Sequence, residues 1–367
     1  MITLFRQGRG FALFMDYDKP FKTIDEQITI MSNRNITISN KENAKEILSN
    51  ISYYTLVNGY KNALTSEQDM FLPKVTPEQL ELAYYLDLEL NSLVIKHILY
   101  VERMLKTKIS YQVAMNYGVW TQTDFGEDNK SFKYYDAKDY LYVPNYSNSS
   151  RRRFSTLKKL KCKVCKCRVK STTMYYKTSK NHIPPWVLAN DLSFGEAIEW
   201  FRILQNPLKT LIANQIIKEK CISDNKKIQV ITNCLLLLRA YRNLMAHGNR
   251  TFSTMIPDDE SLNYNFIKEL CGDDAISKSE YDSGIGKNDF YAVILALTVL
   301  INDPVIFMSL TDDIQQFYKH YTQFAFDDNK TILDVLSLLP DMPERLRNLV
   351  DHFNDINNIS KSSYMND

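Results

Sequence analysis

An arginine, an asparagine and a histidine stand together at the end of a strongly apolar stretch, in the run YRNLMAHGNR at residues 241–250. Asn243 and His247 are four residues apart and therefore share one face of a helix, with Arg242 about 100° away round the helix axis. Gly248 follows directly, so we expect the helix to end there with the imidazole beside the guanidinium. An imidazole can transfer a proton while a guanidinium binds a phosphate and stabilises the charge that develops on it. These residue types therefore predict metal-independent cleavage of RNA, with the 2′-hydroxyl as the nucleophile.

The spacing alone does not distinguish a catalytic site from a structural one. Arg242 could instead pair with a buried carboxylate, and His247 could cap the last carbonyls of the helix. The same spacing recurs in RNLVDH, where Arg347, Asn348 and His352 repeat the pattern. Around this second copy the apolar residues form the stripe of an amphipathic surface helix, namely Leu346, Leu349, Val350 and Phe353. We therefore expect the first copy, and not the second, to carry any activity.

A strongly basic segment lies at residues 151–180, with twelve Lys or Arg and no acidic residue, although the whole chain carries a net charge of only +2. Clustered cations bind nucleic acid by displacing the counterions of its phosphates, and aromatic rings stack on unpaired bases. The residues predicted to bind RNA in this segment are Arg151, Arg152, Arg153, Lys158, Lys159, Lys161, Lys163, Lys166, Arg168, Lys170, Tyr175 and Tyr176. The alternative is a solvated basic loop.

Three cysteines crowd into the same segment, in KCKVCKC. Cys162, Cys165 and Cys167 have a spacing that thiolate ligands of zinc use, but a fourth ligand is missing nearby, with His182 the closest candidate. Zinc binding is therefore left open, and the predicted reaction itself needs neither a metal nor a cofactor. The remaining cysteines are expected to be buried thiols, namely Cys221, Cys234 and Cys271.

The elements that must position these residues are predicted to be helices almost throughout. Gly and Pro number only 10 and 11 in 367 residues, and apolar positions recur with helical period. The expected helices cover residues 23–34, 40–64, 77–118, 224–248 and 290–301. The predicted fold class is therefore all-α. We expect an N-terminal helical region at 1–75, a helical core at 76–310 with an irregular basic insertion at about 119–182, and a C-terminal helical tail at 311–367.

Composition also bears on the compartment. The longest apolar run near the C-terminus, YAVILALTVLI, has eleven residues, about half of the roughly 20 that a membrane helix needs. The N-terminal residues show no apolar segment followed by the small-residue cleavage site of a signal peptide. We therefore expect a cytoplasmic protein without a membrane partner.

Five stretches of the chain resemble the Abi family of bacterial abortive-infection proteins, of the AbiD and AbiF type. They are KPFKTIDEQI at 19–28, ILSNISYYTLVNGY at 47–60, YVERMLKTKISYQVAMNYG at 100–118, IPPWVLANDLSFGE at 183–196 and RNLMAHGNR at 242–250. Their order and spacing agree with the family over most of residues 19–300. The core of that family is a HEPN domain, the helical fold of many metal-independent ribonucleases, so the resemblance implies a HEPN-type helical bundle.

The resemblance also implies roles for individual residues. Matched position by position, the family's catalytic arginine falls on Arg242, its adjacent polar residue on Asn243 and its histidine on His247. Glu102, on an earlier helix, matches a polar position that tends to belong to the catalytic site. The alternative for Glu102 is a simple helix pair with Lys106.

Partners follow from the same resemblance. HEPN domains usually form two-fold dimers whose motifs face each other in one cleft, so a homodimer through this face is expected. Arg250 matches an arginine that often follows the histidine, and it either contacts an RNA phosphate or forms a loop salt bridge. Some relatives are restrained by a structured non-coding RNA that serves as an antitoxin, and residues 151–180 are the physical candidate for binding one.

The function that the resemblance implies is an endoribonuclease that cuts single-stranded RNA in an abortive-infection or toxin–antitoxin system directed against phage. The alternative is a non-catalytic RNA-binding HEPN scaffold, in which Arg242 and His247 hold phosphate without cleaving it.

Overall fold

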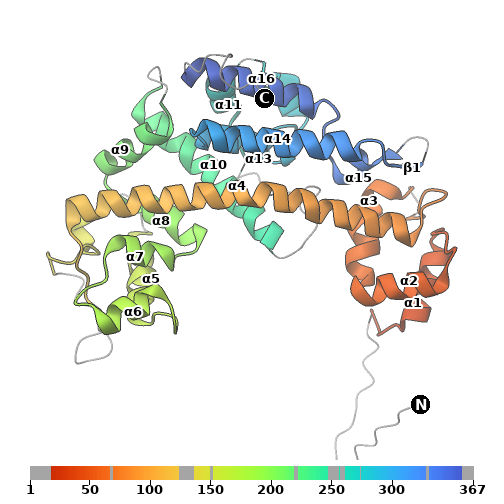
Figure 1. Ribbon diagram of the computed structural model, residues 1–367, viewed down its shortest axis with the longest axis horizontal. Helices are drawn as coiled ribbons and strands as arrows, with labels where there is room; N and C mark the ends of the chain where they lie inside the picture. Colours follow the sequence, from red (N-terminus) through yellow and green to blue (C-terminus); the bar gives the residue numbers. More distant parts are fainter. Residues whose placement is uncertain are drawn as a thin grey trace, which may run out of the picture. The chain divides into compact units, whose positions relative to one another are not determined.

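The computed structural model describes residues 18–66, 69–123, 136–148, 152–218, 222–246, 256, 261–272, 274–327 and 330–357. It divides the chain into two compact units, Met1–Glu81 and Leu82–Asp367. The all-α prediction is confirmed, since helices make up nearly all the regular structure of the described residues (Figure 1). The exception there is one antiparallel pair of short strands, β1 (Ala325–Asp327) and β2 (Lys330–Thr331).

The first unit is built from short capped helices. Helix α1 (Ile24–Asn33) begins at Thr23, whose hydroxyl accepts a hydrogen bond from the Glu26 amide while the Glu26 carboxylate accepts one from the Thr23 amide. Helix α2 (Lys41–Asn50) begins at Asn40, whose side-chain oxygen accepts hydrogen bonds from the amides of Glu42 and Asn43. The N-terminal caps expected at these two positions are confirmed.

The single helix predicted over residues 40–64 is wrong. Helix α2 ends at Asn50, Ile51 is extended, and the chain then forms a π-helical turn η1 (Tyr54–Asn58) followed by α3 (Gly59–Leu64). The break has a local cause, because the Ser52 hydroxyl accepts a hydrogen bond from the amide of Thr55 and so starts a new helical turn.

The segment from Pro77 to Gly118, predicted as one or two long helices, forms the single helix α4 (Pro77–Tyr117), the orange helix of Figure 1. It ends at Gly118, whose φ of +86° suits glycine. Within the second unit, α10 (Asp224–Ala246) packs on α8 (Phe194–Ile203), α9 (Asn206–Ile216) and α13 (Phe290–Leu300). Nearly every residue of α13 is buried, which confirms the predicted core helix.

The rest of the second unit consists of shorter helices around this core. Their bounds are η2 (Val143–Asn145), α5 (Arg153–Cys165), α6 (Thr172–Ser179), α7 (Pro185–Asn190), α11 (Tyr264–Cys271), α12 (Lys278–Asp282), α14 (Pro304–Tyr321), α15 (Ile332–Leu336) and α16 (Met342–Asn357). The predicted boundary at residues 310 and 311 falls inside α14, where both residues are buried. Among the helices described, none is both long enough and apolar enough to cross a membrane.

The basic segment differs most from its prediction. It is not an irregular insertion or a solvated loop, because α5 and α6 are regular helices. Helix α5 packs on α8 through a buried stripe that includes Leu157, Leu160 and Val164. Three apolar residues at helical spacing are enough to bury one face, even though lysines surround them in the sequence. The described residues 136–148, in contrast, are irregular as expected, apart from the short turn η2.

Candidate functional site

Helices α4 and α10 bring two of the predicted site residues together. The Arg242 Nε atom on α10 lies 3.8 Å from the Glu102 Oε2 atom on α4. Both atoms are buried, and neither has a hydrogen-bond partner among the residues that the structure describes. Glu102 is 8% exposed, whereas the Arg242 side chain is 32% exposed. The guanidinium therefore rests on a buried carboxylate while part of it stays accessible.

Lys106 holds the other side of the Glu102 carboxylate. Its Nζ atom donates to Glu102 Oε1 at 2.7 Å and to the carbonyl oxygen of Leu192 at 2.5 Å. The helix pair expected between Glu102 and Lys106 is thus present, and so is the buried carboxylate partner that a structural role for Arg242 requires. One carboxylate makes both contacts, so Glu102 lies between two cations. The bond to Leu192 also ties α4 to the segment that leads into α8.

The position of Arg242 is set by the buried face of α10. Leu238, Tyr241 and Met245 are buried on this helix. Burial raises the pKa of the Tyr241 hydroxyl, which stays protonated and donates to the carbonyl oxygen of Asn288 at 2.6 Å. This anchor fixes the rotation of the last turns of α10. As a result Arg242 lies at the edge of the buried face and Asn243 is exposed to solvent.

Two of the predicted site residues, His247 and Arg250, lie outside the described residues, as does Arg151. Helix α10 is described to Ala246, which directly precedes His247. The expected start of this helix at Asp224 is confirmed.

The second copy of the arginine–histidine spacing lies on α16, at the surface. Arg347 and Asn348 are exposed, and Leu346, Leu349 and Phe353 are buried on the opposite face, as predicted. His352 is half-buried, and its Nε2 atom lies 3.2 Å from the carbonyl oxygen of Leu270. The imidazole thus helps to hold α16 against α11.

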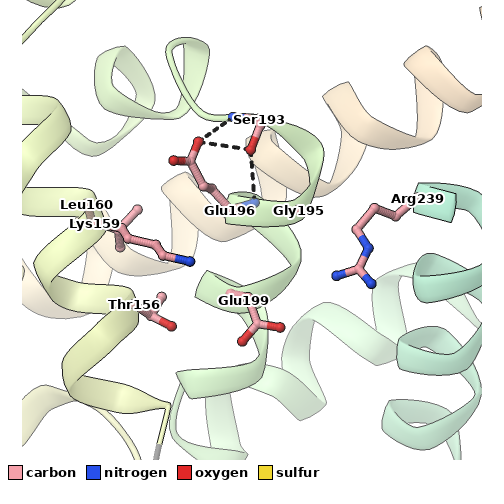
Figure 2. A pocket seen from close by; sticks show the side chains of 8 residues that line it. All are labelled: Thr156, Lys159, Leu160, Ser193, Gly195, Glu196, Glu199 and Arg239. Carbon is pink, nitrogen blue, oxygen red and sulfur yellow. Dashed lines mark hydrogen bonds between the residues drawn. The ribbon is translucent and has the colours of Figure 1, made fainter. Parts of the chain in front are cut away.

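A cavity of about 450 Å³ opens between α5, α8 and α10 (Figure 2). Thr156 and Lys159 come from α5, Glu196 and Glu199 from α8, and Arg239 from α10. Arg239 precedes Arg242 by three residues, so the two side chains leave the same side of α10 about one turn apart. The cavity is therefore next to the Arg242–Glu102 pair along α10.

The first turn of α8 shapes this cavity. The Ser193 hydroxyl accepts from the Glu196 amide, and Glu196 Oε2 accepts from the Ser193 amide at 2.7 Å and from its hydroxyl at 2.9 Å. These bonds hold the Glu196 carboxylate in one place (Figure 2). Glu199, one turn further, accepts from Arg202 at 2.8 Å and from Arg152 at 3.3 Å, both through Oε1.

A shallow basic groove of about 530 Å³ runs along the outer face of α5. We call it the lysine groove; it is lined by Ser155, Lys158, Lys159, Cys162, Lys163, Lys166 and Glu196. Four of the lysines predicted to bind RNA therefore share one surface. The groove and the cavity have Lys159 and Glu196 in common, so they adjoin.

Lys161 does not belong to this surface, and its predicted contact with RNA is wrong. Its side chain is 0% exposed, and its Nζ atom lies 2.6 Å from Asp139 Oδ2. Asp139 also accepts from the amides of Gln122 and Leu141, so the ion pair anchors the irregular residues 136–148 to α5. The basic segment contains no acidic residue, but the fold places Asp139 from outside the segment beside Lys161.

The other basic residues have mixed positions. Arg153 donates to the carbonyl oxygen of Tyr146 at 3.3 Å, and Lys163 lies 3.4 Å from Glu196. Arg168 and Lys170 are exposed in the turn between α5 and α6. On α6, Tyr175 is exposed and Tyr176 half-buried, with their rings edge to face. Tyr175 is thus the accessible ring of the two predicted to stack on bases.

The cysteines are thiols without a metal-like arrangement in the described part of the chain. Cys162 and Cys165 are half-buried, whereas Cys167 is buried 3.8 Å from the sulfur of Met174. No group of three or more His, Cys, Asp or Glu is placed to hold a metal ion among the described residues. Cys234 and Cys271 are buried as expected, and Cys221 lies outside those residues.

Sequence reasoning missed Arg239, Glu196 and Glu199. Arg239 could have been predicted from the sequence, because it precedes Arg242 by about one helical turn and so lies on the same side of the helix. Glu196 and Glu199 carry none that links them to Arg242, since α8 and α10 meet only in the tertiary structure.

The model of one protein family, described as Abi-like protein, matches residues 46–253 of the chain. The matched range includes Glu102, the lysine groove, the cavity residues and the whole of YRNLMAHGNR. Comparisons with curated proteins and with solved structures found no match.

Proposed function

The chain belongs to the Abi-like protein family, and from this premise we propose that it is a metal-independent endoribonuclease of a bacterial abortive-infection system. Arg242 and His247 are its catalytic residues. The observation that carries the proposal is the position of Arg242 at the edge of a buried face, held against the Glu102 carboxylate and still one-third exposed. A guanidinium oriented in this way is suited to bind a phosphate that approaches from solvent.

In the proposed reaction the 2′-hydroxyl attacks the adjacent phosphorus. A bond forms between the 2′-oxygen and phosphorus, and the bond from phosphorus to the 5′-oxygen breaks. The His247 imidazole takes the proton of the 2′-hydroxyl and gives a proton to the 5′-oxygen as it leaves, and the Arg242 guanidinium stabilises the charge on the non-bridging oxygens. The products are a 2′,3′-cyclic phosphate and a 5′-hydroxyl.

Glu102 is a positioning residue in this scheme. Its Oε2 lies against Nε of Arg242, which leaves the terminal nitrogens of the guanidinium to face the phosphate. Asn243 is exposed near the end of α10, where in this proposal it contacts RNA or the second protomer of a two-fold dimer, the arrangement usual for HEPN domains.

The lysine groove is the proposed path for RNA. It adjoins the cavity that reaches α10, so a strand that lies along α5 can extend to Arg242. Clustered lysines bind RNA through its phosphates. We assign to this groove the substrate strand or a structured RNA that restrains the enzyme.

A non-catalytic RNA-binding protein is the second candidate. It is favoured by the ion pair of Arg242 with Glu102, since a residue with a structural partner need not perform chemistry. The two candidates differ in the role of His247. The nuclease needs its imidazole to transfer a proton, whereas a protein that only binds RNA does not.

The deciding experiment compares the wild type with Arg242→Ala and His247→Ala on single-stranded RNA in excess EDTA. The nuclease cleaves under these conditions and leaves 5′-hydroxyl ends, and both variants lose cleavage by about 100-fold or more. Products with 5′-phosphate ends, or full inhibition by the chelator, would contradict the mechanism. RNA binding without cleavage by the wild type would identify the non-catalytic protein.

A further inference from the structure

We propose that the cavity between α5, α8 and α10 binds a guanine base of RNA, next to the phosphate that Arg242 holds. This inference rests on the proposed function, since it names a base preference for the same site. The cavity measures about 450 Å³, within the roughly 300–1,000 Å³ typical of pockets for small ligands. Its position one helical turn along α10 from Arg242 is that of a neighbouring nucleotide.

The walls of the cavity carry both donors and acceptors. Lys159 and Arg239 extend toward the space from opposite sides, and the Glu199 carboxylate lies between them (Figure 2). The hydrogen bonds that Glu199 accepts from Arg202 and Arg152 both use its Oε1 atom. Glu196 is held in place by Ser193 at the cavity edge. Cations and carboxylates both line the wall, which argues against a site for phosphate alone.

Guanine matches this set of groups. Its N7 and O6 accept hydrogen bonds, and arginine or lysine donors commonly bind that edge. Its N1–H and amino group donate, and a carboxylate accepts such bonds. Guanine alone among the four bases presents two adjacent acceptors, N7 and O6, beside two adjacent donors, N1–H and the amino group. We therefore expect the combination of cations with a carboxylate to favour guanine.

Gly195 keeps the cavity open. A Cβ atom at this position would lie 3.4 Å from Cδ of Arg239, in contact with the stem of that side chain. Alanine at residue 195 would therefore fit the fold, with its methyl group in van der Waals contact with Arg239 and occupying part of the cavity edge. Since alanine is also the better helix former, this variant separates ligand binding from stability.

The test is equilibrium dialysis of the full chain with guanosine 3′-monophosphate, the three other nucleoside 3′-monophosphates and inorganic phosphate. We expect guanosine 3′-monophosphate to bind about tenfold or more tightly than any other probe. Equal binding of all four nucleotides, or equally tight binding of phosphate alone, would overturn the proposal.

Variants locate the preference in the cavity. Glu199→Gln and Gly195→Ala should each weaken binding of guanosine 3′-monophosphate several-fold and leave weak binding of the other nucleotides unchanged. The matched control is Glu269→Gln, which removes the charge of a glutamate that pairs with Lys226 on a surface away from the cavity. Retention of the guanine preference in both cavity variants would also refute the site.

The nucleotide-binding measurements test the guanine site independently of RNA cleavage. A chain that binds guanosine 3′-monophosphate selectively but cleaves no RNA would contradict the proposed nuclease and keep the guanine site. A chain that cleaves RNA with no preference for guanosine and binds all nucleotides alike would keep the nuclease and lose the guanine site.

Discussion

Arg242 Nε and Glu102 Oε2 lie 3.8 Å apart, both buried and both without a hydrogen bond to any residue that the structure describes. The distance is within that of an ion pair but too long for a hydrogen bond. Lys106 keeps the carboxylate in place through its 2.7 Å bond to Oε1.

Glu102 is predicted to affect activity and stability separately. Glu102→Gln leaves the Lys106 cation buried without its counterion and should cost about 3 kcal/mol of unfolding free energy. The double variant Glu102→Gln with Lys106→Met removes both charges and should recover most of that stability, while RNA cleavage stays about tenfold or more below wild type. Urea unfolding and cleavage rates measure the two effects. If the double variant regained RNA cleavage as well as stability, Glu102 would have only a structural role.

The arginine–histidine copy on α16 is predicted to be dispensable for chemistry. Arg347→Ala should leave both activity and unfolding free energy within error, because the side chain is exposed. His352→Ala should cost about 1 kcal/mol, because the imidazole no longer reaches the Leu270 carbonyl, with cleavage unchanged. Loss of cleavage in either variant, with the fold intact by circular dichroism, would mean that the catalytic copy has been misassigned.

The lysine groove is predicted to set the salt dependence of RNA binding. Lys158→Glu with Lys166→Glu changes two lysines that line the groove but not the cavity. The slope of log Kd against log salt should fall by about 0.7 for each RNA phosphate that no longer meets a lysine. Filter binding over a salt series gives the slope. An unchanged slope would exclude the groove as the RNA path.

Lys161 is predicted to act on stability alone. Lys161→Ala leaves the Asp139 carboxylate buried without its cation and should cost about 3–5 kcal/mol of unfolding free energy. Lys161→Met with Asp139→Asn should cost much less, because no unpaired charge remains. Neither change should alter the salt slope of RNA binding in protein that stays folded. A reduced slope for the double variant would show that Lys161 contacts RNA after all.

The cap of α12 is predicted to lose its effect in acid. Hydrogen bonds from Ser277 and Arg345 lower the pKa of Glu280 from 4.5 to about 2. Because the folded-state pKa is the lower one, this stabilisation is complete above about pH 4.5 and is lost as the pH falls toward 2. Ser277→Ala should therefore cost about 1 kcal/mol at pH 7 and progressively less below pH 4. Urea unfolding of both proteins across this range provides the measurement, and a constant difference would contradict it.

The helical class and the elements with strong, uninterrupted periodicity can be predicted from local sequence patterns. Helices α4 and α13 follow from apolar spacing over many turns, and the starts of α1 and α2 follow from their capping residues. These signals are local, so they need no knowledge of the fold. The wrong prediction at residues 40–64 also has a local cause. Apolar periodicity favoured one helix there, but α2 ends at Asn50 and the Ser52 hydroxyl starts a new helical turn.

Which charged residues face solvent and which face each other depends on the tertiary packing of the helices. Lys161 and Lys158 stand in the same basic run, yet one is buried against Asp139 and the other lines the groove, because α5 turns a single face to α8. Glu102 and Arg242 are 140 positions apart in the chain and meet because the part of α4 that carries Glu102 lies in the same unit as α10. Charge density counts residues along the chain, whereas burial and pairing depend on which helix faces pack together.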